Sequence, residues 1–140
     1  MRRSFKIVNL LRSLCLIKHC YMKTHKDLEV WQKSIAIVSS LYALTSKYPA
    51  NEIYGITSQI RRAAVSIPAN ISEGAARNHR KEFLYFLGIS IGSAAELETL
   101  LLISFNLKFI ADEAYFQTSM DLEKIIRMLI NLKRSLSREL

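Results

Sequence analysis

The chain has 140 residues, half of them apolar, and a formal net charge of +8. This length fits one domain with a single continuous core. Four glycines and two prolines are too few for the frequent turns of an all-β domain, so the composition predicts an all-α fold. The excess of basic residues favours a polyanionic partner such as RNA, DNA or an acidic protein surface.

The first 21 residues form a basic segment. Its apolar stretch at residues 7–17 is interrupted by Arg12, and no small-residue cleavage site follows, so a secretory signal is not expected. We interpret residues 1–21 as a basic N-terminal extension upstream of a natural start at Met22, and residues 22–140 as the four-helix-bundle domain. Five basic residues and no acid leave a net charge of +3 for the remainder: Arg2, Arg3, Lys6, Arg12 and Lys18.

Metal binding and membrane insertion are not expected. Cys15, His19 and Cys20 lack the spaced pairs of a zinc site. No cysteine follows Cys20, so the domain needs no disulfide and a cytoplasmic location is expected. The apolar run at residues 83–95 is 13 residues long, short of the roughly 20 that span a membrane, so we predict a buried helix there.

The first predicted helix begins near Leu28 and ends before Pro49. Asp27 lies near its start, where a carboxylate favours the exposed amide groups. Apolar residues recur there in steps of three and four, the period of an amphipathic helix, and are expected to face the core: Leu28, Trp31, Ile35, Val38 and Tyr42.

The second predicted helix contains a proline and ends near residues 74–78. An interior proline costs roughly 3 kcal/mol in an ordinary helix, so Pro68 predicts a kink supported by tertiary packing. Asn70 and Glu73 are predicted to form hydrogen bonds with backbone groups that the kink frees. The core positions predicted for this helix are Ile56, Ile60, Ala64, Ile67, Ile71 and Ala75.

Two further helices are predicted, with Asn78 and Asp112 as their caps. Gly88 and Gly92 lie four residues apart in the third helix. Each costs about 1 kcal/mol relative to alanine, so a neighbouring helix is expected to cross closely there. Short connections favour antiparallel neighbours, and the predicted fold is an antiparallel up-down-up-down four-helix bundle with a proline-kinked second helix.

The third and fourth helices carry more apolar residues than one shared core needs. Such a surplus usually marks an interface, so we predict self-association. The surplus residues are Ile89, Ile91, Leu100, Leu102, Ile103, Ile125, Met128 and Ile130.

Several motifs in series resemble one known family: residues 27–33, 54–57, 59–74, 80–83 and 96–98. The chain resembles the S23 family of four-helix-bundle proteins, named for open reading frames in intervening sequences of bacterial 23S ribosomal RNA. The relatives include accessory proteins of diversity-generating retroelements. The resemblance implies a ring-like homopentamer, and among retroelement relatives a reverse transcriptase as partner. It also marks six motif positions, interpreted as structural: Trp31, Pro68, Asn70, Glu73, Gly74 and Glu96.

The motifs of catalysis are missing from the sequence. Glu96 and Glu98 stand two apart on a helix and point to different sides, so they do not form an acid and base pair. No nucleophile motif or glycine-rich phosphate loop occurs. We therefore expect a protein that is not an enzyme, with no catalytic residue and no cofactor. Glu96, within an apolar stripe, is interpreted as a buried partner of Arg61 or Arg62.

The candidate nucleic-acid-binding residues are basic. Arginine grips phosphate with two nitrogens, and a helix N-terminus adds backbone donors, so these residues are predicted to bind a phosphate backbone without reading sequence. The predicted function is a non-enzymatic homo-oligomer that binds structured RNA or another nucleic acid as a ribonucleoprotein accessory or scaffold. The basic residues alternatively form a solvated face with local ion pairs. The alternative functions are a scaffold whose basic surface docks a protein such as a reverse transcriptase, or a passenger of a mobile rRNA insertion. The candidates are Arg61, Arg62, Arg77, Arg80 and Lys81.

Overall fold

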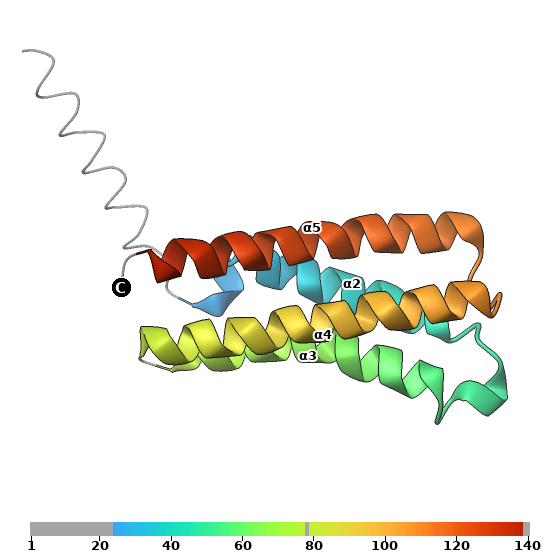
Figure 1. Ribbon diagram of the computed structural model, residues 1–140. Coiled ribbons are helices and arrows are strands. Elements are labelled where there is room, and N and C mark those ends of the chain that lie inside the picture. Colours follow the sequence, from blue (N-terminus) through green and yellow to red (C-terminus); the bar gives the residue numbers. More distant parts are fainter. Residues whose placement is uncertain (1–23, 78, 139–140) are drawn as a thin grey trace, which may run out of the picture.

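The computed structural model describes residues 24–77 and 79–138, which form helices and short connections without any strand (Figure 1). The four long helices are α2 (Glu29–Thr45), α3 (Ile56–Ala76), α4 (Arg80–Asn106) and α5 (Asp112–Ser137). Two short 3₁₀ turns, η1 (His25–Asp27) and η2 (Ala50–Glu52), precede α2 and α3. The all-helical prediction is confirmed for the described residues, while residues 1–21 and Asn78 lie outside them.

Each of the four helices packs against two others. Helix α2 contacts α3 and α5, and α4 contacts α3 and α5, whereas the diagonal pairs α2 with α4 and α3 with α5 do not pack together. The contact between α3 and α4 is the most extensive, and these two helices lie side by side in Figure 1. This cyclic order of neighbours is that of a four-helix bundle in which consecutive helices adjoin.

Every helix contributes large aliphatic side chains to one core. Burying each of them stabilises the fold by about 1.5–3 kcal/mol. Helix α3 follows its predicted apolar stripe closely, because that stripe combines aliphatic residues with small ones that fill the same seam. Ile125 of α5, predicted as a surplus apolar residue outside the core, is only 1% exposed and lies in the core. The large side chains with almost no exposure are Leu41, Ile60, Ile67, Ile71, Leu87, Leu97, Leu101, Leu122, Ile125 and Leu129.

The buried face of α2 differs from the predicted one. Ile35 and Tyr42, both expected in the core, are 41% and 44% exposed. The buried stripe instead includes Ser34 and Thr45, whose hydroxyls donate to the carbonyls of Val30 (2.6 Å) and Leu41 (2.7 Å) in the same helix. A hydroxyl satisfied by its own helix enters a core at small cost. These two polar residues therefore face the core, while Ile35 and Tyr42 lie on the exposed face of α2.

Helix α3 continues across the buried Pro68 without interruption. The Ser72 hydroxyl donates to the Pro68 carbonyl at 2.9 Å and accepts the indole N–H of Trp31 at 2.8 Å, which joins α3 to α2. Asn70 donates to the Ser66 carbonyl at 2.8 Å, not to the Ala64 carbonyl that the proline leaves without its usual donor.

Glu73 has no part in satisfying the backbone near Pro68. Its carboxylate is exposed and forms an ion pair with Arg77 at 2.8 Å. The predicted role of Glu73 is therefore wrong. One turn of helix separates the two residues, so the nearest cation holds this carboxylate at the surface.

Helices α3 and α4 approach each other closely at Gly74, near the end of α3. A Cβ added there would stand 2.7 Å from Cβ of Phe86 and 2.9 Å from Cδ2 of Phe83 on α4. At Gly92 nothing lies within 4 Å of such an atom, and at Gly88 only the Lys133 ammonium lies near, at 3.0 Å. The close crossing predicted at Gly88 and Gly92 is thus wrong for the described residues.

Neither of the residues that immediately precede the two later helices caps its helix with a side-chain hydrogen bond. His79 precedes α4, and Ala111 precedes α5, so Asp112 is the first residue of α5 rather than its cap. An acid at that position still interacts favourably with the helix dipole. Among the described helices, α4 alone is long and apolar enough to span a membrane by length and composition. A core helix of a bundle meets the same criterion, and α4 packs between α3 and α5.

Candidate nucleic-acid interface

The predicted basic residues fall into two groups at opposite ends of α3. Arg61 and Arg62 lie near its start, whereas Arg77 ends it and Arg80 and Lys81 begin α4. Sixteen residues separate Arg61 from Arg77, about 24 Å along a helix with a rise of 1.5 Å per residue. The structure therefore does not bring the five predicted residues together.

Arg61 is a packing residue between α3 and α2. Its Nε donates to the Thr45 hydroxyl at 2.9 Å, and its guanidinium lies 4.6 Å from the ring centroid of Tyr42. Glu96, by contrast, is exposed and makes no ion pair with a described residue, so its interpretation as a buried partner of Arg61 or Arg62 is wrong. A hydroxyl and an aromatic face hold Arg61 where a carboxylate was expected.

The second group surrounds the junction of α3 and α4. The guanidinium of Arg77 forms its ion pair with Glu73 and lies 5.5 Å from the ring centroid of Phe86. The hydrogen bond that Arg77 donates to the Glu73 carboxylate raises the pKa of Arg77, which therefore stays cationic. Lys81 is exposed, and Arg80 is partly buried. The first turn of α4 adds backbone N–H groups that lack helical partners.

Three further cations come from the last turns of α5. The Lys133 ammonium lies over Gly88, which places the end of α5 against the first turns of α4. Figure 1 shows the red end of α5 at the same end of the bundle as the start of α4 and the end of α3. We call this end of the bundle the basic end, and its cations are Arg77, Arg80, Lys81, Lys133, Arg134 and Arg138.

The sequence analysis missed the α5 residues of the basic end. The sequence does contain a signal for them, because the last predicted helix ends in a cationic turn. If consecutive helices of the bundle are antiparallel, the end of that helix adjoins the start of the helix before it. A cation in a last turn also interacts favourably with the helix dipole.

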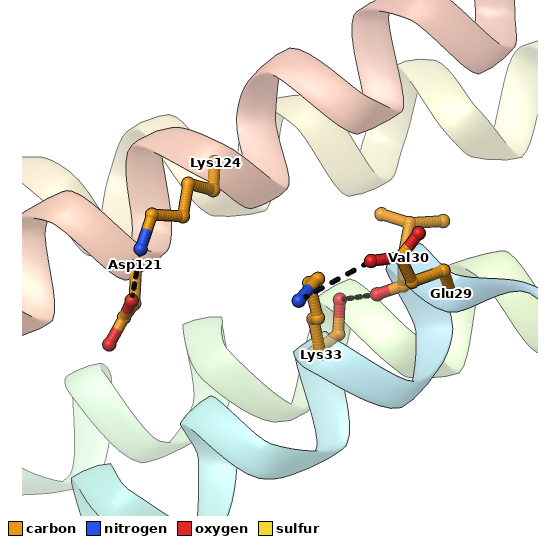
Figure 2. A network of polar contacts seen from close by, with 6 residues as sticks. Glu29, Val30, Lys33, Asp121 and Lys124 are labelled. Carbon is orange, nitrogen blue, oxygen red and sulfur yellow. Dashed lines mark hydrogen bonds and ion pairs between the residues drawn. The ribbon is translucent and has the colours of Figure 1, made fainter.

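A cavity of about 310 Å³ separates α2 from α5. Figure 2 shows two lysines beside it, each with an acid of its own helix: Lys33 lies 3.4 Å from Glu29, and Lys124 lies 3.0 Å from Asp121. Hydrogen bonds from Gln117 and Lys124 lower the pKa of Asp121. Because each lysine has a carboxylate partner, this cavity adds little to the cationic surface.

Residues 24–77 and 79–138 contain no group of three or more histidine, cysteine, aspartate or glutamate residues that is able to hold a metal ion. The described structure thus gathers basic side chains at the ends of helices, and no cluster of metal ligands.

Two comparisons with known proteins find matches, one with a protein family and one with solved structures. Residues 26–131 match the model of a family described as 23S rRNA-intervening sequence protein. A crystal structure of a protein of unknown function from the S23 ribosomal protein family of Bacteroides thetaiotaomicron is 28% identical in sequence, with a TM-score of 0.69. The alignment covers 74% of this chain and 97% of that chain. Among curated proteins, none matches the chain.

Proposed function

Because the chain belongs to the 23S rRNA-intervening sequence protein family, we propose that it is a non-enzymatic, oligomeric bundle protein that binds structured RNA or another nucleic acid. It acts as an accessory or scaffold in a ribonucleoprotein. The observation that carries this proposal is the basic end, to which α3, α4 and α5 contribute six cations.

The chemistry of the basic end suits phosphate contacts. Arginine presents a planar fork of donors that matches two phosphate oxygens, whereas lysine acts as a point charge. Glu73 and Glu82 are the nearby acids of α3 and α4 and partly offset these cations. Phosphate replaces a carboxylate partner at an exposed position with little loss, because exposed ion pairs contribute only about 0–1 kcal/mol. The contacts recognise the backbone and carry no base specificity.

Self-association completes the proposal. Helix α4 presents an exposed apolar stripe on the side away from the core, with Tyr85 67%, Ile89 36% and Ile103 41% exposed, and with Gly92 between them. Steps of four, three and eleven residues place all four on one helix face. We propose that this stripe joins copies of the chain, in a pentamer of the kind that the family resemblance implies. Repeating a weak basic surface on one particle strengthens binding to a long polyanion.

The proposed bundle has an up-down-up-down order and a kink at Pro68, as predicted from the sequence. The cyclic packing of α2, α3, α4 and α5 supports the order, and the burial of Pro68 within an unbroken α3 supports a helix shaped by its packing. In this order the basic end lies at the start of α4 and the end of α5.

The test is binding of the full-length protein to a structured RNA across a salt series. Replacing Lys81 and Arg134, two exposed cations of the basic end, is expected to weaken binding and to flatten its salt dependence, because fewer counterions are released. Replacing Lys47 and Arg62 is the matched control, since these exposed cations lie at the opposite end of the bundle. Absence of RNA binding by the parent protein favours the protein-scaffold alternative instead.

A further inference from the structure

A second hollow lies at the opposite end of the bundle from the basic end, between the end of α2, η2 and the start of α3. Its volume is about 330 Å³, within the size range of sites for small ligands. Pro49, Ala50 and Ile53 give it apolar walls. Its polar lining includes Thr45, Thr57 and Arg61.

Arg61 is the charged residue that lines this hollow. Its Nε atom and the face of its guanidinium are held by Thr45 and Tyr42, which fixes the orientation of the group. Its two terminal nitrogens donate to no described residue. A guanidinium fixed in this way keeps a fork of donors open for an anion with two oxygens.

Thr57 supplies an independent sign of a ligand. Its side chain is only 4% exposed, and its hydroxyl has no hydrogen-bond partner among the described residues. Buried hydroxyls without a partner are unusual and unfavourable. Thr57 and Arg61 stand one turn apart on the same face of α3, so both border the same part of the hollow.

Two polar groups beside the hollow are not assigned to the ligand. The Glu52 carboxylate accepts the backbone N–H of Ile56 at 3.2 Å and so occupies the start of α3. An anion in the hollow must therefore be held by Arg61 rather than by the helix end. Tyr48 also lines the hollow, and its hydroxyl makes no hydrogen bond within the described chain. That hydroxyl lies near Ser104 of α4, so it is not assigned to the ligand.

We infer that this hollow binds a small molecule with one oxyanion group, a carboxylate or a phosphate ester, and an apolar body. The oxygens of the anion accept from the terminal nitrogens of Arg61 and pair with the Thr57 hydroxyl, which turns about its Cα–Cβ bond toward the hollow. The apolar body lies against Pro49 and Ile53. The site is separate from the basic end, about 24 Å away along α3, and does not rest on nucleic-acid binding.

The test is isothermal titration calorimetry of the full-length protein with two probes, hexanoate and phenyl phosphate. At least one probe is expected to bind saturably, and the probe that binds more tightly identifies the oxyanion. Thr57→Val and Arg61→Gln are expected to weaken that binding about tenfold or more, as loss of a hydrogen bond to a charged group does. Arg62→Gln, which changes the exposed neighbour of Arg61, is expected to leave the affinity within about twofold.

Thr57→Val also keeps the inference falsifiable if Arg61→Gln does not fold. It is isosteric and removes the unpartnered hydroxyl, so the variant is expected to melt at a higher temperature than the parent without ligand while binding the probe more weakly. Two results overturn the inference: neither probe binds saturably up to about 10 mM, the weak limit of specific affinity, or Thr57→Val binds the probe as tightly as the parent does.

Discussion

The ammonium of Lys133 lies 3.0 Å from the point where a Cβ on Gly88 would stand. The missing side chain of a glycine on α4 thus leaves room for a cation of α5 on the surface of α4. This relationship places the last turns of α5 beside the first turns of α4, and it brings the basic residues of separate helices to one end of the bundle. Gly88 therefore makes no close helix crossing, but it leaves room for the Lys133 ammonium on the surface of α4.

The glycines of α3 and α4 are expected to respond oppositely to alanine. Gly74→Ala forces a Cβ to within 2.7 Å of Phe86 Cβ, so we expect a loss of about 1–3 kcal/mol in the free energy of unfolding. Gly92→Ala meets no atom of a described residue within 4 Å, so helix propensity should raise that free energy by up to about 1 kcal/mol. Urea denaturation followed by circular dichroism measures both. Equal effects of the two substitutions contradict the packing described at Gly74.

Arg61 and Arg62 are expected to differ in stability effects. Arg61→Ala removes the hydrogen bond to Thr45 and the contact with Tyr42, so the melting temperature should fall by several degrees, the shift that about 1 kcal/mol produces in a domain of this size. Arg62→Ala changes an exposed side chain and should leave the melting temperature within about a degree. Differential scanning calorimetry makes the comparison. A fall in melting temperature of equal size in both variants contradicts the packing role assigned to Arg61.

Truncation of residues 1–21 is expected to leave the fold intact. The four helices and their shared core all lie within residues 24–138, so the shortened protein should keep its helix content and remain soluble. Far-ultraviolet circular dichroism, normalised per molecule, provides the measurement. A product that is insoluble, or that loses helicity well beyond the residues removed, shows that the segment supports the bundle.

Helix α4 provides the expected contact between copies of the chain. Native mass spectrometry is expected to give a homo-oligomer, with five subunits as the predicted number. Ile89→Glu combined with Ile103→Glu puts charges on the exposed apolar stripe and should produce monomers that keep their helicity. Glu98→Ala, an exposed change elsewhere on α4, is the control. A monomeric parent at micromolar concentrations contradicts the interface, and a dimer or tetramer contradicts only the pentamer.

The sequence predicted the helices and most of the core, because aliphatic residues of α3 and α4 recur with helical spacing and have no other place to be buried. Ile60 and Leu97, for instance, lie where their stripes put them. The face of α2 escaped prediction because Ser34 and Thr45 satisfy their own hydroxyls inside the helix. Such hydrogen bonds depend on local geometry that a hydrophobic pattern does not contain.

The candidate interface was only half predictable. Arg77, Arg80 and Lys81 adjoin in sequence, so their proximity followed from the chain itself. Lys133 and Arg134 join them through tertiary packing across more than forty residues, and Arg61 leaves them because the length of α3 separates the two groups. Contacts between distant segments set both outcomes.

The central claim is tested most directly by the salt dependence of RNA affinity. The parent protein, Lys81→Ala/Arg134→Ala and Lys47→Ala/Arg62→Ala are each titrated with one structured RNA and one unrelated structured RNA, after native mass spectrometry shows equal subunit numbers. Removing two phosphate contacts should weaken binding to both RNAs about equally and lower the slope of log affinity against log salt by roughly 1.5–2 per chain bound. The Lys47 and Arg62 variant should match the parent. If the parent does not bind at low salt, or if the basic-end variant keeps the parent's affinity and slope, the basic end is not a nucleic-acid interface.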